Sequence, residues 1–169
     1  MACLQAGANA NSHAEIGNNS CNGNEACEIA GYNAGDAKIG DDSCNGYYAC
    51  YETGSDGGEA RIAFRQDDEH DDDYRRRTWG TGWNQTGNER GACNSYYACQ
   101  YAGEKGYAEI ARGACFGEEA CTEVGYTAGY AKIGAGSCKG NRACYYAGYN
   151  GGNATIGKFF VGAPAVGSP

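Results

Sequence analysis

The stretch SCNGYYAC at residues 43–50 places two cysteines six positions apart, with a glycine and two tyrosines between them. Four other stretches follow the same plan: SCNGNEAC at 20–27, ACNSYYAC at 92–99, ACFGEEAC at 114–121 and SCKGNRAC at 137–144. With the cysteines in register, the chain divides into units of about 23 residues that start near residues 14, 37, 60, 108, 131 and 154. The pattern predicts a single repeat domain over residues 1–169.

The most uniform position of the unit is an isoleucine with an alanine two residues before it. These isoleucines are Ile16, Ile39, Ile62, Ile110, Ile133 and Ile156. Alternate residues of a strand share a face, so alanine and isoleucine are expected to point inward together. The residue between them varies as Glu15, Lys38, Arg61, Glu109, Lys132 and Thr155, which is typical of a side chain that points to water.

Short extended segments separated by glycine corners predict an all-β fold, a parallel β-solenoid (β-helix) with three extended segments in each coil. Right-handed winding is expected because parallel crossovers have this hand by default. Helical repeats are an alternative, but their units are longer and need good helix formers. Disorder is another, because Leu, Ile, Val and Phe supply only 15 of the 169 residues.

The paired cysteines are predicted to form disulfides inside each coil, because a small apolar core needs additional bracing. The predicted pairs are Cys21 with Cys27, Cys44 with Cys50, Cys93 with Cys99, Cys115 with Cys121 and Cys138 with Cys144. Reduced, stacked thiols and a metal site are alternatives, although zinc sites prefer closer cysteines or histidines. Cys3 aligns with the second cysteine of the unit and has no partner, so it is a candidate free or intermolecular thiol in an incomplete first coil at residues 1–13.

An insertion at residues 65–90 interrupts the third full unit. Its acidic run is a candidate Ca²⁺ site, since clustered carboxylates supply the oxygen ligands that calcium prefers; the run comprises Asp67, Asp68, Glu69, Asp71, Asp72 and Asp73. The alternative is a solvated loop whose charges are compensated by the arginines that follow. Trp79 and Trp83 in the same insertion are candidates for stacking on sugar rings or for packing on the solenoid. No other cofactor is expected.

The two ends of the chain depart from the repeat. Residues 157–169 lose the cysteines and gain aromatic residues and prolines, which predicts a C-terminal cap. The first ten residues lack the pattern of a secretory signal peptide, so the chain is expected to be a mature form or a fragment of a longer array. No apolar run is long enough to span a membrane.

Tyrosines occupy outward positions and are expected to align when the coils stack. Tyr47, Tyr48, Tyr96 and Tyr97 are the candidates for ligand binding or self-association, because tyrosine offers broad, amphipathic contact at low rotamer cost. The alternative is that tyrosine is simply a favourable strand residue.

Short coils with an internal cysteine pair resemble the disulfide-braced solenoid antifreeze proteins of insects. The resemblance concerns the architecture of the repeat, and it implies ice binding as one possible function. Those proteins present regularly spaced threonines, whereas the exposed position here carries Glu, Lys, Arg, Glu, Lys and Thr in successive units.

The composition excludes one class of partner and favours one environment. A formal net charge of −8 without a basic stripe argues against nucleic-acid binding. Paired cysteines favour an oxidising compartment, so the protein is expected to be secreted or on the cell surface. Three candidate glycosylation sequons, at Asn18, Asn84 and Asn153, agree with that location.

No catalytic motif occurs in its required context, so an enzyme is not expected. The sequence favours an extracellular structural or binding solenoid that contacts copies of itself, as in a filament, or a glycan or cell-wall surface. The alternatives are a carbohydrate-active β-helix enzyme that uses the acidic insertion, and an ice-binding protein.

Overall fold

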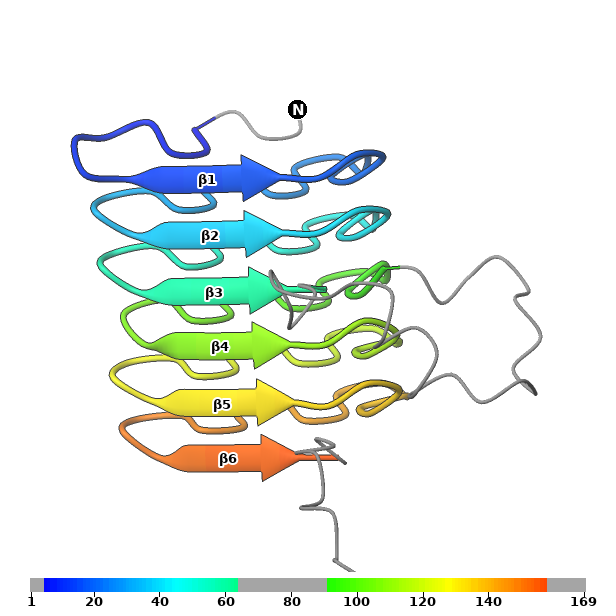
Figure 1. The fold of residues 1–169 in the computed structure, drawn as a ribbon. Helices are drawn as coiled ribbons and strands as arrows, with labels where there is room; N and C mark the ends of the chain where they lie inside the picture. Colours follow the sequence, from blue (N-terminus) through cyan, green and yellow to red (C-terminus); the bar gives the residue numbers. More distant parts are fainter. Residues whose placement is uncertain (1–4, 64–90, 158–169) are drawn as a thin grey trace, which may run out of the picture.

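The computed structural model describes residues 5–63 and 91–157, which form a stack of parallel coils (Figure 1). Six four-residue strands in these described residues pair in chain order in one parallel sheet. They are β1 (His13–Ile16), β2 (Asp36–Ile39), β3 (Glu59–Ile62), β4 (Tyr107–Ile110), β5 (Tyr130–Ile133) and β6 (Asn153–Ile156). The predicted all-β parallel β-solenoid of about 23-residue coils is confirmed.

The isoleucine positions stack in single file, as the repeat predicts. Ile16 pairs with Ile39 in register, and the same pairing continues through the sheet to Ile156. The inward alanines and isoleucines of β2 to β5 are buried, whereas those of β1 and β6 are only partly buried. A narrow core of alanine, cysteine and isoleucine therefore runs along the axis.

Truncating an isoleucine in the middle of this file is expected to destabilise the protein strongly. Ile110→Ala leaves a cavity at a fully buried position, which costs about 2–5 kcal/mol of unfolding free energy. Ile156→Ala is the matched control, since the same position in β6 is only partly buried and should cost less. Urea unfolding measures both values, and equal losses would contradict the register.

Within residues 5–63 and 91–157 each coil contains one strand, and the expectation of three extended segments per coil is wrong. Between the strands many non-glycine residues have positive φ, for example Cys44 at 56° and Cys50 at 57°. The backbone there bonds to both neighbouring coils: Cys50 N donates to Ala98 O at 3.0 Å, and Tyr48 N donates to Asn24 O at 3.1 Å. The backbone N–H and C=O groups of the stacked turns thus form hydrogen bonds with neighbouring coils, where strands were expected to form them.

The hand of the winding is opposite to the one expected. Outward-facing strand residues direct their N–H groups to the following coil, as in the bonds from His13 N to Gly35 O (3.0 Å) and from Asp36 N to Gly58 O (2.9 Å). In an L-polypeptide strand that runs left to right and is seen from outside, this places the next strand below, as in Figure 1. A chain that descends in this way is left-handed. The right-handed rule depends on a right-handed helix that packs back on a twisted sheet, whereas these coils close through turns of positive-φ residues.

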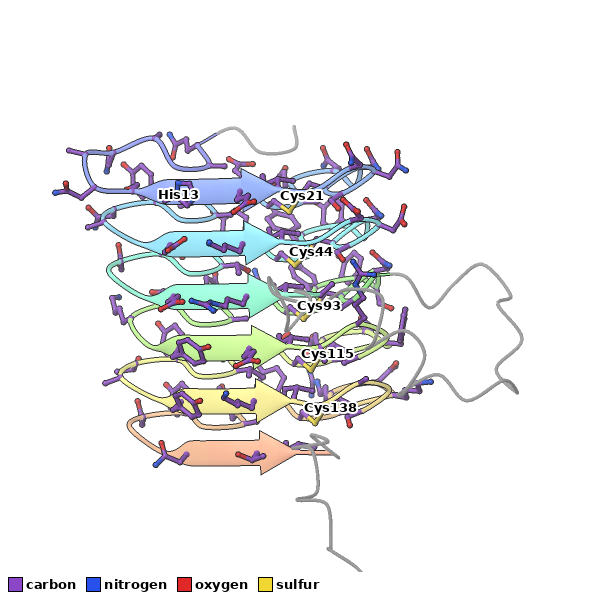
Figure 2. All side chains as sticks on the ribbon, in the orientation of Figure 1. His13, Cys21, Cys44, Cys93, Cys115 and Cys138 are labelled. Carbon is purple, nitrogen blue, oxygen red and sulfur yellow. A yellow bond between two sulfur atoms is a disulfide. The ribbon has the colours of Figure 1, made fainter. Side chains whose placement is uncertain are left out.

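The paired cysteines form one disulfide in each of five successive coils. Figure 2 shows their sulfur atoms in a column beside the ends of the strands. In every pair the Cα atoms lie 5.6 or 5.7 Å apart, which is ordinary disulfide geometry. The pairs are Cys21–Cys27, Cys44–Cys50, Cys93–Cys99, Cys115–Cys121 and Cys138–Cys144.

Candidate interaction surface

Two stacked tyrosine pairs lie on the turns that the disulfides close. Tyr47 stacks on Tyr96 with ring centroids 5.2 Å apart and planes 10° apart. Tyr48 stacks on Tyr97 at 5.3 Å and 20°. The members of each pair occupy the same repeat position in neighbouring coils, so the coil spacing of about 4.8 Å brings one ring over the other. The structure therefore brings together all four tyrosines that the sequence predicts as an interaction surface.

Two more stacked pairs lie outside that selection. Tyr107 and Tyr130 begin β4 and β5, and their rings stack at 4.8 Å and 7°. Tyr126 and Tyr149 stack at 5.4 Å and 4°. The two tyrosines of each pair occupy the same position in neighbouring repeat units. Comparing the aligned units for aromatic residues at every position would therefore have predicted both pairs.

Edge contacts join most of these rings into one tyrosine network. Successive ring centroids in it lie between 4.3 and 6.3 Å apart. Its members are Tyr47, Tyr48, Tyr51, Tyr96, Tyr97, Tyr101, Tyr126, Tyr145, Tyr146 and Tyr149. Aromatic pairs of this kind contribute about 0.5–1.5 kcal/mol each beyond their buried area. The network therefore stiffens one side of the solenoid as well as covering it.

Several rings of the tyrosine network are exposed to solvent. Within a stacked pair each ring covers a face of the other, as in Tyr47 and Tyr96, which remain 37% and 45% exposed. Tyr146 is 49% exposed. The surface thus offers stacked tyrosine rings that repeat at the coil spacing.

Carboxylates and burial raise the pKa values of three of the tyrosines, two in the tyrosine network and one at the start of β4. A hydrogen bond to Glu25, together with desolvation, holds the pKa of Tyr48 above its usual range. Burial raises the pKa of Tyr101 to about 12. Burial and Glu109 raise the pKa of Tyr107 to about 12, and its Oη donates to Glu109 Oε2 at 3.1 Å. Tyr48 and Tyr107 therefore place hydroxyl donors beside carboxyl acceptors.

The side chains at the exposed middle position of the strands form ion pairs that the sequence did not predict. Lys38 Nζ lies 3.6 Å from Glu15 Oε2, and Lys132 Nζ lies 2.9 Å from Glu109 Oε2, so charges of opposite sign meet between neighbouring coils. Such pairs contribute little individually at a solvated surface. Opposite charges on this face of the sheet therefore largely cancel. In this respect the face differs from the tyrosine network.

A buried carboxylate lies between the tyrosine network and the charged residues. Glu104 is 4% exposed; its Oε1 accepts a hydrogen bond from Lys105 Nζ at 3.1 Å, whereas its Oε2 has no hydrogen-bond partner among the described residues. Desolvation and the charge of Glu104 raise the pKa values of Glu52 and Glu123. Local repulsion among these carboxylates is offset in part by Lys105, which also pairs with Asp56 at 3.2 Å.

The remaining candidates divide between exposed and undescribed residues. Asn18 and Asn153 are exposed, as a glycosylation site requires. The following lie outside the described residues: the six acidic residues of the insertion, Trp79, Trp83, Asn84, Cys3 and the C-terminal cap from residue 158 onward. Among residues 5–63 and 91–157, the side chains close enough to share a metal ion are cysteines of neighbouring disulfides. The same residues contain no helix that could cross a membrane.

Comparison with known proteins adds one match. A family model described as a domain of unknown function (DUF7640) matches residues 1–73, which contain the first two full coils and the start of the third. No curated protein matches the chain. No solved structure matches it either.

Proposed function

We propose that this chain is an extracellular structural repeat protein that associates laterally with copies of itself through the tyrosine network. The observation that carries the proposal is the in-register stacking of Tyr47 on Tyr96 and Tyr48 on Tyr97 across neighbouring coils. Multiple disulfides support an extracellular or secreted location, because such bonds persist in oxidising compartments.

The stacked rings suit association for an entropic reason. Ordering a side chain at an interface costs about 0.5–1.5 kcal/mol, and rings already held by their neighbours lose little further freedom. Tyrosine is also among the residues enriched at interfaces. A stiff, pre-ordered tyrosine surface therefore binds with a smaller entropic cost than isolated tyrosines would.

The chemistry of the surface favours a second copy over a sugar. A sugar ring stacks on an open aromatic face, and within each stacked pair one face of each ring is already covered by its partner. Phenol hydroxyls donate and carboxylates such as Glu25 accept, so two identical surfaces can exchange donor and acceptor contacts. A two-fold symmetric dimer uses the same patch on both chains and requires this kind of self-complementarity.

Net charge opposes association and supplies a first diagnostic. With a formal charge of −8 the chains repel one another, and salt screens that repulsion over about 10 Å at 0.1 M. Association is therefore expected to strengthen as ionic strength rises.

Replacing one stacked pair is expected to weaken association at least about tenfold, which corresponds to about 1.4 kcal/mol. The test variant is Tyr47→Ser with Tyr96→Ser, measured by sedimentation velocity over a range of protein and salt concentrations. Tyr32→Ser is the control, because Tyr32 has no ring contact among the described residues. Unchanged association in the double variant, with its circular dichroism intact, would overturn the proposal.

Co-sedimentation with insoluble polysaccharide and an assay for released sugar complete the test. A glycan or cell-wall partner, the other partner expected from the sequence, predicts that the protein sediments with polysaccharide while remaining monomeric alone. The rival carbohydrate-active enzyme predicts release of reducing sugar. Either outcome with a monomeric protein would replace self-association as the function.

A further inference from the structure

Among the described residues, disulfides brace the solenoid within its coils and none joins one coil to the next. Each of the five disulfides closes a turn within its own coil, at a sequence separation of six. Among the described residues, neighbouring coils are held together by backbone hydrogen bonds, side-chain contacts and ring stacking. The axis of the stack is therefore its least constrained direction.

The stacked tyrosine pairs lie along that axis. With coils counted from residues 14, 37, 60, 108 and 131, every stacked pair joins two successive coils. Tyr47–Tyr96 and Tyr48–Tyr97 join the second coil to the third, Tyr107–Tyr130 joins the third to the fourth, and Tyr126–Tyr149 joins the fourth to the fifth. Phenol rings meet at each of these three junctions.

We propose that these stacked pairs are sites of oxidative cross-linking, at which a peroxidase-type oxidant with hydrogen peroxide couples two tyrosines of neighbouring coils into dityrosine. Each phenol loses one electron to the oxidant and one proton to a nearby base. The two phenoxyl radicals join through a carbon–carbon bond between their ortho positions, and the rings regain aromaticity by tautomerisation. In total two hydrogen atoms leave, and one hydrogen peroxide becomes two water molecules.

The geometry provides what this reaction needs. Radical coupling requires the second ring to be within reach before the first radical is quenched, and the stacked centroids are already 4.8 to 5.4 Å apart. Tyr47, Tyr96 and Tyr130 are exposed, so an oxidant can reach them, and a tilt of two stacked rings brings their ortho carbons together. Glu109 Oε2, which accepts the hydroxyl hydrogen of Tyr107 at 3.1 Å, is a proton acceptor already in place.

The continuity of the tyrosine network lets oxidation begin at any exposed ring. Each ring in it has a neighbour within 6.3 Å, so an electron vacancy formed at exposed Tyr146 can move ring by ring. The vacancy stops moving where two stacked rings are both radicals, because the two rings then couple. The inference is independent of lateral self-association, because the coupled rings belong to one chain.

The test oxidises an equal mixture of ordinary and ¹⁵N-labelled folded protein with peroxidase and hydrogen peroxide at low protein concentration. After reduction and tryptic digestion, mass spectrometry should find cross-linked peptides that have lost two hydrogens. The expected pairs are 39–61 with 91–105, 106–112 with 113–132, and 113–132 with 143–158. Each pair should carry a single isotope composition, because the bond forms within one chain.

A single substitution removes one expected cross-link and leaves another as an internal control. Tyr130→Phe should abolish the link between 106–112 and 113–132 and leave the link between 39–61 and 91–105 at its wild-type yield. Cross-links of mixed isotope composition, or equal yields from the reduced and urea-unfolded chain, would overturn the assignment. Mixed cross-links would also mean that tyrosines of two chains meet, so the outcomes for this inference and for self-association are distinguishable.

Discussion

Complete reduction of the disulfides is expected to unfold the protein at room temperature without denaturant. A disulfide that closes so short a loop contributes about 2 kcal/mol by restricting the unfolded chain, so the five together contribute about 10 kcal/mol. That value is comparable to the whole net stability of an ordinary domain, about 5–15 kcal/mol. The core that remains is mostly alanine, with a single isoleucine per strand.

Circular dichroism before and after treatment with a phosphine reductant and alkylation measures this effect. Protein exposed to the alkylating agent alone serves as the control. A reduced and alkylated chain that keeps its native spectrum would show that stacking suffices without the disulfides.

Removing one disulfide separates the contributions of the middle and the end of the stack. Cys93→Ala with Cys99→Ala removes a fully buried bond within the third coil, in the middle of the stack, whereas Cys138→Ala with Cys144→Ala removes a partly exposed bond within the fifth coil. The middle variant is expected to lose more unfolding free energy in urea.

Gly106→Ala is expected to prevent folding or to remove most of the stability. A Cβ at Gly106 would collide with the carbonyl oxygen of Gly125 and would lie 2.8 Å from that of Gly129, both in the following coil. The obstacle is rigid backbone, and Gly129 O already accepts the hydrogen bond of Tyr107 N at 2.9 Å. Losses above about 4–5 kcal/mol are exceptional for one substitution, and a clash with fixed backbone is a mechanism that reaches them.

Gly152→Ala is the matched control for this prediction. Gly152 occupies the same position of the repeat, but its nearest neighbour is Tyr149 O at 3.0 Å in its own coil. This variant should express as a folded protein with a slightly lower thermal midpoint. Comparable damage from both substitutions would mean that the coils do not approach one another as closely as the structure shows.

The sequence was sufficient to predict that repeat units stack as coils and which residues form the core. A period near 23 residues, one isoleucine per unit and cysteines six positions apart each have one simple physical reading, and together they agree on stacked coils. Ile62 and Ile110 are adjacent in the file although 48 residues separate them, because the insertion leaves the repeat on either side unchanged.

The path between the strands could not be read in the same way. Positive φ is usually expected at glycine, and here Cys44, Tyr48 and Cys50 adopt it, because bonds to both neighbouring coils and the disulfide hold the turn. Conformations imposed by tertiary contacts leave no local sequence signal. The left-handed winding follows from the same turns and was missed for the same reason.

The candidate surface was predicted in part. Tyr47 and Tyr96 share a repeat position, so their stacking followed from the alignment. Contacts such as that of Tyr101 with Tyr126, at 6.3 Å, join different repeat positions and depend on how the turns bend. The extent of the tyrosine network therefore required the structure.

Mapping the disulfides of the native protein tests the central claim most directly, since the account requires every coil to be closed from within. Tryptic digestion without reduction should give peptides 39–61, 91–105 and 113–132, each with an internal disulfide, and peptide 133–139 joined to 143–158. Disulfides that join 39–61 to 91–105, or free thiols at these cysteines, would contradict the stack of internally braced coils.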